Sequence, residues 1–226
     1  MPKETLHYSR LLPDSVRDSA RLRLALTHRS AHPDKNNERL EFLGDAVLGL
    51  AVADWLYRNH PEWSEGDMSR IRSTLVNREA LNAVGQRTGL IDHIHVSGSM
   101  TDEQSPISSR VVASAVEAVI GAVYLECGER QARDFVLAWL APLLEAVPDD
   151  PEQAKDPKTR LQERLQMQHR KRPVYRTLLS PASGGNATGF LVECSSGTIK
   201  TVGFGATKRD AELAAASEML SHAELA

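Results

Sequence analysis

The chain has 226 residues, of which 41% are hydrophobic and 25% charged, an ordinary composition for a globular protein with room for one or two domains. The first ten residues contain no apolar core, and no run reaches the roughly 18 apolar residues of a membrane span, so the sequence predicts neither a secretory signal nor a membrane helix. Its two cysteines, Cys127 and Cys194, lack metal-ligand spacing and are typical of free thiols in a reducing cytosol.

Residues 1–147 have the apolar spacing of helices throughout. Apolar side chains recur at three- and four-residue intervals, and no strand-like alternation of any length occurs. We therefore expect an all-α first domain. Its predicted helices fall within 16–25, 39–57, 67–84, 110–125 and 132–144.

A proline-bearing segment separates this part from the rest. Residues 148–155 are acidic and polar, and they predict a flexible linker. Asp156 followed by Pro157 is a good helix start, and Thr207 can cap a last, alanine-rich helix. Residues 156–226 therefore predict a small α+β domain of order α-β-β-β-α. Its strands are expected at 174–179, 190–194 and 199–204.

The two parts carry opposite net charges. Residues 1–154 contain 16 Lys and Arg against 23 Asp and Glu, a net charge of −7. Residues 155–226 contain 11 against 7, a net charge of +4. This asymmetry favours a polyanion-binding domain beside a carboxylate-rich site, although a chance distribution of charge is the alternative.

Three acids share one stripe of the helix predicted at 39–57. At about 100° per residue, Glu38, Glu41 and Asp45 fall within an arc of about 60°, opposite the apolar face. A solvated helix face, which is the alternative, normally interleaves lysine with glutamate. Because this stripe has no cation and like charges repel, we expect a positive group to lie there.

The segment RVVASAVEAVIGAVYL, residues 110–125, is apolar on nearly every face except at Glu117. Such a helix is normally buried, and a buried carboxylate needs a partner. If the two helices pack together, Glu117 faces Glu41 and Asp45, and a divalent ion would satisfy all three. Carboxylate oxygens are ligands that suit Mg²⁺ or Mn²⁺, and these ions commonly assist phosphodiester hydrolysis in enzymes. A buried ion pair with an arginine of another helix is the alternative.

Several motifs follow one another along the chain: LTHRS, NERLEFLGDAVL, EGDMSRIRSTLVNREAL, VEAVIGAVYL, DPKTRLQERLQ and TKRDAELAAA. Together they resemble the bacterial ribonuclease III family of double-strand-specific endoribonucleases. The resemblance implies an all-helical endonuclease domain that forms a homodimer, followed by a double-stranded-RNA-binding domain. It also implies hydrolysis of double-stranded RNA to 5′-phosphate and 3′-hydroxyl ends with short 3′ overhangs, in cytoplasmic rRNA and mRNA processing.

The resemblance implies roles for the acids. Glu41, Asp45 and Glu117 match metal-binding acids, with Asp45 and Glu117 as catalytic residues. The implied cofactor is Mg²⁺, which Mn²⁺ can replace. Glu38 and Glu65 match further acids that line the same active-site valley.

Two other nuclease positions stand out. Phe42 matches an aromatic residue that packs into the partner subunit, and its helical angle points away from the apolar face. Ser114 stands where the family usually has an aspartate, so it keeps an oxygen and loses a charge. We expect Ser114 to be a weak metal ligand. The alternative function is a double-stranded-RNA-binding dimer with weakened or absent cleavage.

In the tail, the resemblance implies contacts from one face of the first helix, from the loop before Phe190 and from the start of the last helix. Such contacts read A-form shape and 2′-hydroxyl groups. A helical hydrolase of small nucleotides is a third interpretation, and this long basic surface argues against it. The implied RNA-binding residues are Thr159, Gln162, Gln166, Asn186, Lys208 and Arg209.

Overall fold

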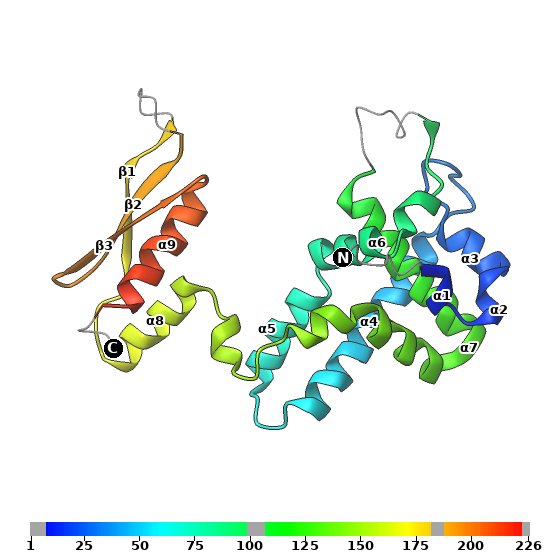
Figure 1. The fold of residues 1–226 in the computed structure, drawn as a ribbon, viewed down its shortest axis with the longest axis horizontal. Coiled ribbons are helices and arrows are strands. Elements are labelled where there is room, and N and C mark those ends of the chain that lie inside the picture. The colour runs from blue at the N-terminus through cyan, green and yellow to red at the C-terminus, as the bar shows by residue number, and fades with distance from the viewer. Residues whose placement is uncertain (1–7, 99–106, 182–187, 223–226) are drawn as a thin grey trace, which may run out of the picture. The chain divides into compact units, whose positions relative to one another are not determined.

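The structure, a computed structural model, describes residues 8–98, 107–181 and 188–222 (Figure 1). The chain divides into two compact units, Met1–Asp149 and Asp150–Ala226. The described part of the first unit is helical, and the second unit combines helices with one three-stranded sheet. The predicted fold class, an all-α part followed by an α-β-β-β-α part, is confirmed.

In the described part of the first unit, four helices begin at a side-chain cap. The side chains of Ser19, Ser64, Asn77 and Ser108 each accept a hydrogen bond from the backbone three residues further on, which satisfies a free N–H group of the first turn. The elements are α1 (Tyr8–Leu11), α2 (Asp14–Arg17), α3 (Ala20–Ala25), α4 (Glu38–Asn59), α5 (Glu65–Leu75), α6 (Arg78–Arg87), the 3₁₀ helix η1 (Leu90–His93) and α7 (Ser109–Glu145).

The core of the first unit is built around α7, which packs against α3, α4 and α6. By length and composition alone α7 could cross a membrane, but 61% of its most apolar window is buried within the protein. Its apolar character therefore has an explanation in packing. The two helices predicted at 110–125 and 132–144 form one element with a break at Gly128, whose φ of 81° is not helical.

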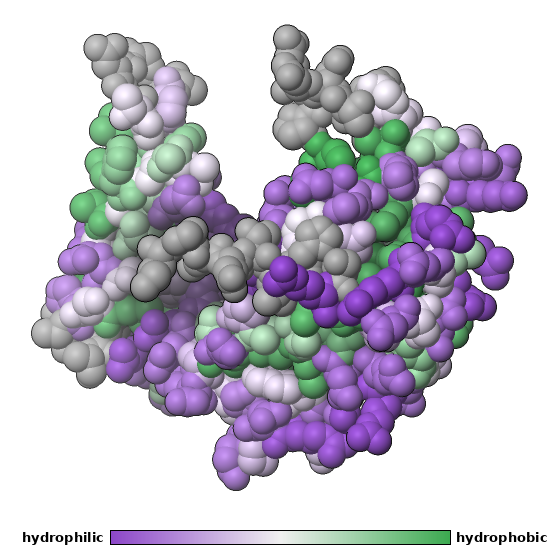
Figure 2. Space-filling view, turned by 45° about the vertical axis from the view of Figure 1, so that its right-hand side comes forward, coloured by the Kyte–Doolittle hydropathy of each residue, from purple (hydrophilic) through white to green (hydrophobic). Residues whose placement is uncertain are grey.

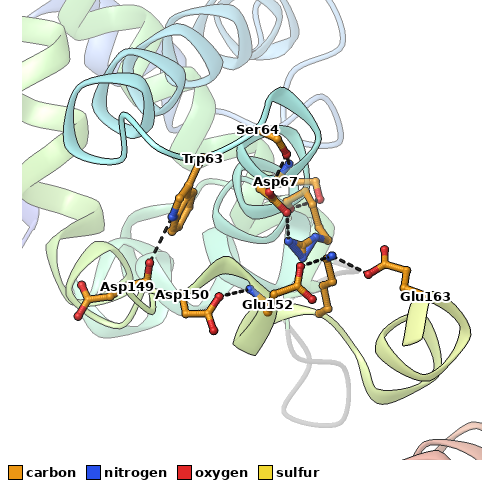
Figure 3. A network of polar contacts seen from close by, with 10 residues as sticks. Trp63, Ser64, Asp67, Asp149, Asp150, Glu152 and Glu163 are labelled. Carbon is orange, nitrogen blue, oxygen red and sulfur yellow. Dashed lines mark hydrogen bonds and ion pairs between the residues drawn. The ribbon is translucent and has the colours of Figure 1, made fainter. Parts of the chain in front are cut away.

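The end of the first unit is attached to the segment between α4 and α5. The indole Nε1 of Trp63 donates a hydrogen bond to the carbonyl oxygen of Asp149 at 3.2 Å (Figure 3). The His60 ring stacks on Trp63 with a centroid separation of 3.8 Å, and Trp55 meets the same ring edge-on. These contacts fix where the chain leaves the helical unit.

The second unit contains the 3₁₀ helix η3 (Pro151–Ala154), α8 (Pro157–Met167), β1 (Val174–Leu179), β2 (Phe190–Ser196), β3 (Ile199–Gly205) and α9 (Lys208–Leu220). Its strands form an antiparallel sheet in the order β1-β2-β3. The helices α8 and α9 enclose a core with the sheet, in which Leu161, Cys194 and Met219 are fully buried. At Gly203 a Cβ atom would lie 2.2 Å from the Ala215 nitrogen, so β3 and α9 are in backbone contact.

The segment expected as a flexible linker contains local structure. Asp150 caps η3, and Lys155 forms ion pairs with Glu152 and, at 2.6 Å, with Glu163 of α8 (Figure 3). The beginning of the second unit is thereby joined to its first long helix.

The strands of the second unit also leave apolar side chains exposed. Figure 2 shows apolar surface on this part of the molecule. Among the exposed side chains are Val174, Leu179, Val202 and Phe204. An antiparallel sheet with helices on one face commonly leaves its other face in solvent.

Candidate active site

The helices α4 and α7 cross with their backbones in contact. A Cβ atom on Gly44 would lie 1.7 Å from the carbonyl oxygen of Glu117, and one on Gly121 would lie 2.4 Å from the carbonyl oxygen of Leu40. Only glycine permits such an approach at these two positions. The crossing brings the acidic stripe of α4 beside the one carboxylate of the apolar part of α7.

Three carboxylates meet at this crossing. Burial, followed by the charges of Asp45 and Glu41, raises the pKa of Glu117 from 4.5 to about 7. Asp45 is exposed, and Glu41 and Glu117 are partly buried. The structure therefore brings together the three acids that the helical spacing placed on facing stripes.

This cluster contains no cation in contact with its carboxylates within the described part of the chain. None of the three carboxylates forms an ion pair there, so the alternative of a buried pair between Glu117 and an arginine finds no support. Among the described residues, no group of three or more His, Cys, Asp or Glu side chains is already arranged to hold a metal ion. Like charges without a cation favour separation. The oxygen donors suit a hard divalent cation, whose binding would draw them together.

Ser114 lies one turn before Glu117 on the same face of α7. Its hydroxyl donates a hydrogen bond to Oε1 of Glu41 at 2.9 Å. A hydroxyl in this place fixes the orientation of the Glu41 carboxylate. The serine is therefore part of the cluster, as a neutral donor.

Glu38 and Glu65 lie in different places. Glu38 is exposed, pairs with Arg29 at 3.1 Å and lines the same hollow as Glu41. Glu65 is the first residue of α5, accepts a hydrogen bond from the Ser69 hydroxyl at 2.7 Å and lines a separate hollow against the C-terminal half of α4. Within one chain, Glu65 is not brought to the acidic crossing.

Phe42 stands on the outside of α4 with 81% of its surface exposed. It borders an open hollow of about 820 Å³ together with Leu24, Leu43 and Leu125. Leu125 and Leu50 are also exposed. An exposed apolar group of this kind is typical of a protein interface.

In the second unit, α8 and α9 present most of the predicted RNA-binding residues. Thr159 and Gln162 line one hollow with Arg209, and Thr159 donates a hydrogen bond to Asp156 at 2.7 Å. Gln166, Lys208 and Arg209 are exposed. Asn186 lies outside the described residues.

Sequence reasoning missed the basic side of the acidic cluster. A hollow of about 330 Å³ next to Glu41 and Ser114 is also lined by His28, Arg29 and Arg110. The sequence could have indicated the position of Arg110, because it precedes Ser114 by four residues and so lies on the same helix face.

The fold and the acidic crossing define a helical nuclease unit joined to an RNA-binding unit, and comparisons with known proteins agree. Residues 18–144 match the family model described as ribonuclease-III-like, and residues 157–222 match the double-stranded RNA binding motif. The chain belongs to the ribonuclease III family.

Individual relatives cover nearly the whole chain. Ribonuclease 3 of Vibrio vulnificus (strain YJ016) is 44% identical over 210 residues, which span 92% of each protein. Ribonuclease 3 of Idiomarina loihiensis is 37% identical over 225 residues, 98% of this chain and 97% of the relative. The resemblance predicted from the motifs is confirmed, and the chain is an endoribonuclease.

Solved structures agree for the first unit. A nuclease domain of ribonuclease III from Campylobacter jejuni matches with 33% identity and a TM-score of 0.57, covering 65% of this chain and 99% of that one. A second structure of the same domain matches with 35% identity and a TM-score of 0.56, covering 62% and 96%, and its description names a region involved in dimer formation.

Proposed function

We propose that the chain hydrolyses phosphodiester bonds of double-stranded RNA in a reaction that depends on a divalent cation. The observation that carries this proposal is the meeting of Glu41, Asp45 and Glu117 at the α4–α7 crossing, with no ion-pair partner among the described residues. Its products are 5′-phosphate and 3′-hydroxyl ends with short 3′ overhangs, and its setting is rRNA and mRNA processing in the cytoplasm.

The residues have distinct roles in this proposal. Glu41, Asp45 and Glu117 hold Mg²⁺, which Mn²⁺ can replace, because hard cations prefer carboxylate oxygens. Ser114 orients Glu41 through its hydrogen bond and adds a weak neutral ligand. When bound, the cation supplies Lewis acidity to the phosphate and lowers the pKa of water. Glu38 and Glu65 are further acids of the active-site valley.

Two molecules of the chain act together in this proposal. Phe42 and its apolar neighbours form the surface that a second copy covers, since 81% of Phe42 is exposed. A homodimer then carries two acidic sites, one for each strand of the duplex. Glu65 lies away from the acids of its own chain, and a valley shared between two subunits is where it would act.

The second unit supplies duplex recognition. Thr159, Gln162 and Gln166 on α8 are the proposed contacts to one minor groove, and Asn186 is the proposed contact of the loop before β2. Lys208 and Arg209 begin α9, where positive side chains and free backbone amides suit phosphates. The partner is therefore double-stranded RNA, recognised mainly by shape, and no membrane is involved.

The first prediction is cleavage of a long, perfect RNA duplex when Mg²⁺ or Mn²⁺ is titrated into the full chain. We expect Glu117→Gln to lower the rate by at least about a hundredfold, because it removes one charge of the metal site. Ser114→Asp should lower the Mg²⁺ concentration required, because it adds a fourth carboxylate. The measurement is the rate of duplex shortening on a denaturing gel.

Two results would contradict this prediction. Cleavage by Glu117→Gln at the natural rate would remove the acidic crossing from the mechanism. If the natural chain binds the duplex without cleavage at any metal level while Ser114→Asp cleaves it, the alternative holds. The neutral Ser114 then makes the natural protein a double-stranded-RNA-binding dimer.

A further inference from the structure

A hollow lies directly beside the acidic crossing, and its chemistry differs from that of the crossing. Its volume is about 330 Å³. Glu41 and Ser114 form the side shared with the acids, and Arg29 and Arg110 line it as well. The two arginines balance Glu38 and Glu41 in formal charge, so a divalent cation on Glu41 would make the surroundings of the hollow positive.

The two arginines differ in how freely their side chains can bind a ligand. Arg29 pairs with Glu38 at 3.1 Å, and both side chains are largely exposed, so the pair is weak. Arg110 is exposed and forms no ion pair within the described ranges. It stands in the first turn of α7, where the helix dipole disfavours a cation and favours an anion. An anion in the hollow would relieve this unfavourable arrangement.

The identity of residue 114 affects which partners Arg110 can bind. The two residues are four apart on one helix face, the spacing at which an aspartate and an arginine form an ion pair. With serine there, the hydroxyl is engaged with Glu41, and the guanidinium of Arg110 remains available for a ligand. A guanidinium matches the geometry of a phosphate group.

An independent observation comes from Asn37, which also lines this hollow. Its side chain is fully buried, and neither its amide oxygen nor its amide nitrogen has a hydrogen-bond partner among the residues that the structure describes. Its backbone is held at both ends: the N–H donates to Thr27, and the carbonyl accepts from Glu41. A buried amide without partners is costly, and a ligand that offers both donors and acceptors would remove that cost.

We propose that this hollow binds a phosphate of the RNA strand next to the scissile one, with Arg110 as its main contact. The proposal rests on the proposed function, because it takes RNA as the ligand. Phosphate oxygens would accept from Arg110 and from the Asn37 amide, and the adjoining ribose hydroxyl would donate to the Asn37 oxygen. The strand would thereby be aligned past Glu41 and Ser114 toward the cation site.

The test measures binding of a labelled RNA duplex by the full chain at a series of KCl concentrations, in a Glu117→Gln background that prevents cleavage. Each phosphate contact adds about one to the slope of log affinity against log salt. We expect Arg110→Gln to reduce the slope by about one and to weaken binding alike for duplexes of different sequence. Arg110→Lys should keep the slope.

The matched control is Arg130→Gln, an exposed arginine of the same helix beyond the break at Gly128. It should leave both the slope and the affinity unchanged. If Arg110→Gln behaves like Arg130→Gln, the phosphate site is refuted. Cleavage by the natural chain is scored separately, so absent cleavage with a clear slope difference would overturn the proposed function and leave the phosphate site standing.

Discussion

Ser114 places a neutral hydrogen-bond donor, and no negative charge, beside Glu41 in the acidic cluster. Its 2.9 Å bond to Glu41 orients that carboxylate, and the cluster has three carboxyl groups where an aspartate would add a fourth. The mutual repulsion of the cation-free side chains is thereby smaller, and so is the attraction for a divalent ion. A single residue thus lowers both the repulsion within the cluster and its attraction for the cation.

The raised pKa of Glu117 predicts a pH dependence of the cation-free protein. Its carboxyl titrates near 7 in the folded chain and at its ordinary value of 4.5 when unfolded, so the folded state binds the proton more tightly. This contribution to stability is complete below pH 4.5 and is lost as the pH rises through about 7. Because the carboxyl is partly exposed, the loss is on the order of 1 kcal/mol.

This second prediction is checked by thermal unfolding in the presence of a chelator, comparing the natural chain with Glu117→Gln. Other titrating groups are common to both proteins, so the difference between the two curves isolates Glu117. The natural chain should lose stability relative to the variant between about pH 5 and pH 8, and excess Mg²⁺ should reduce the difference. Parallel curves in the chelator would contradict the prediction.

Part of the site could be predicted from residue spacing. Helical angles placed Glu41 and Asp45 on one stripe and Glu117 on an apolar helix, and the structure brings these side chains together. Spacing could not reveal the Ser114–Glu41 bond or the unpartnered amide of Asn37. Both depend on the rotation of α4 against α7, which the pattern within either helix does not determine.

At the scale of elements, caps and glycines determine what apolar spacing alone leaves open. The continuous pattern over residues 67–84 predicted one helix, whereas the structure has α5 and α6. Asn77 adopts an extended conformation and its side chain accepts from the Ala80 N–H, so a new helix begins there. The two strands at 190–194 and 199–204 were predicted to within two residues, since Gly197 with its φ of 60° marks the hairpin turn between them.

The close crossing of α4 and α7 gives a third prediction. In Gly44→Ala, the new methyl group would meet the Glu117 carbonyl at 1.7 Å, so the helices must separate. Such overpacking costs about 1–3 kcal/mol, and displacement of Glu117 should also lower cleavage. Gly49→Ala on the same helix is the control, because its methyl group meets nothing within 4 Å.

Chemical denaturation measures the free energy of unfolding of both variants. We expect Gly49→Ala to raise the free energy of unfolding by up to about 1 kcal/mol, since alanine is the better helix former, and Gly44→Ala to lower it. Equal stability changes in the two variants would show that the backbones do not touch at Gly44. The sequence motif contains this glycine, but only the packed pair of helices explains why it is needed.

At the scale of the whole molecule, the two units divide the work. The helical unit contains the acids and the exposed apolar group around Phe42, and the second unit contains a polar hollow lined by Lys158, Gln162 and Arg209 of α8 and α9. The division was readable from the sequence, because the acidic and basic residues fall on opposite sides of a proline-bearing segment. The assembly of two copies was implied by the resemblance to a family, since no pattern within one chain states which exposed surface a partner covers.

The proposed homodimer leads to the last prediction, Phe42→Ala. The exposed Phe42 ring is large and borders a hollow of about 820 Å³, so in a dimer it would be an anchor buried by the partner. Truncation of such an aromatic anchor typically costs about 2 kcal/mol or more, which weakens dimerisation at least about thirtyfold. Sedimentation equilibrium over a range of protein concentrations measures this change directly.

Met167→Ala is the matched control for Phe42→Ala, because Met167 is a large apolar side chain that is 75% exposed on α8 of the other unit. The Met167→Ala substitution should leave the dimer intact. At high protein concentration, both variants should unfold at the same temperature as the natural chain. Loss of the dimer in Phe42→Ala should also reduce cleavage of both strands, because the valley that includes Glu65 is then incomplete. A Phe42→Ala protein that dimerises as tightly as the Met167→Ala protein would place the subunit interface on another surface.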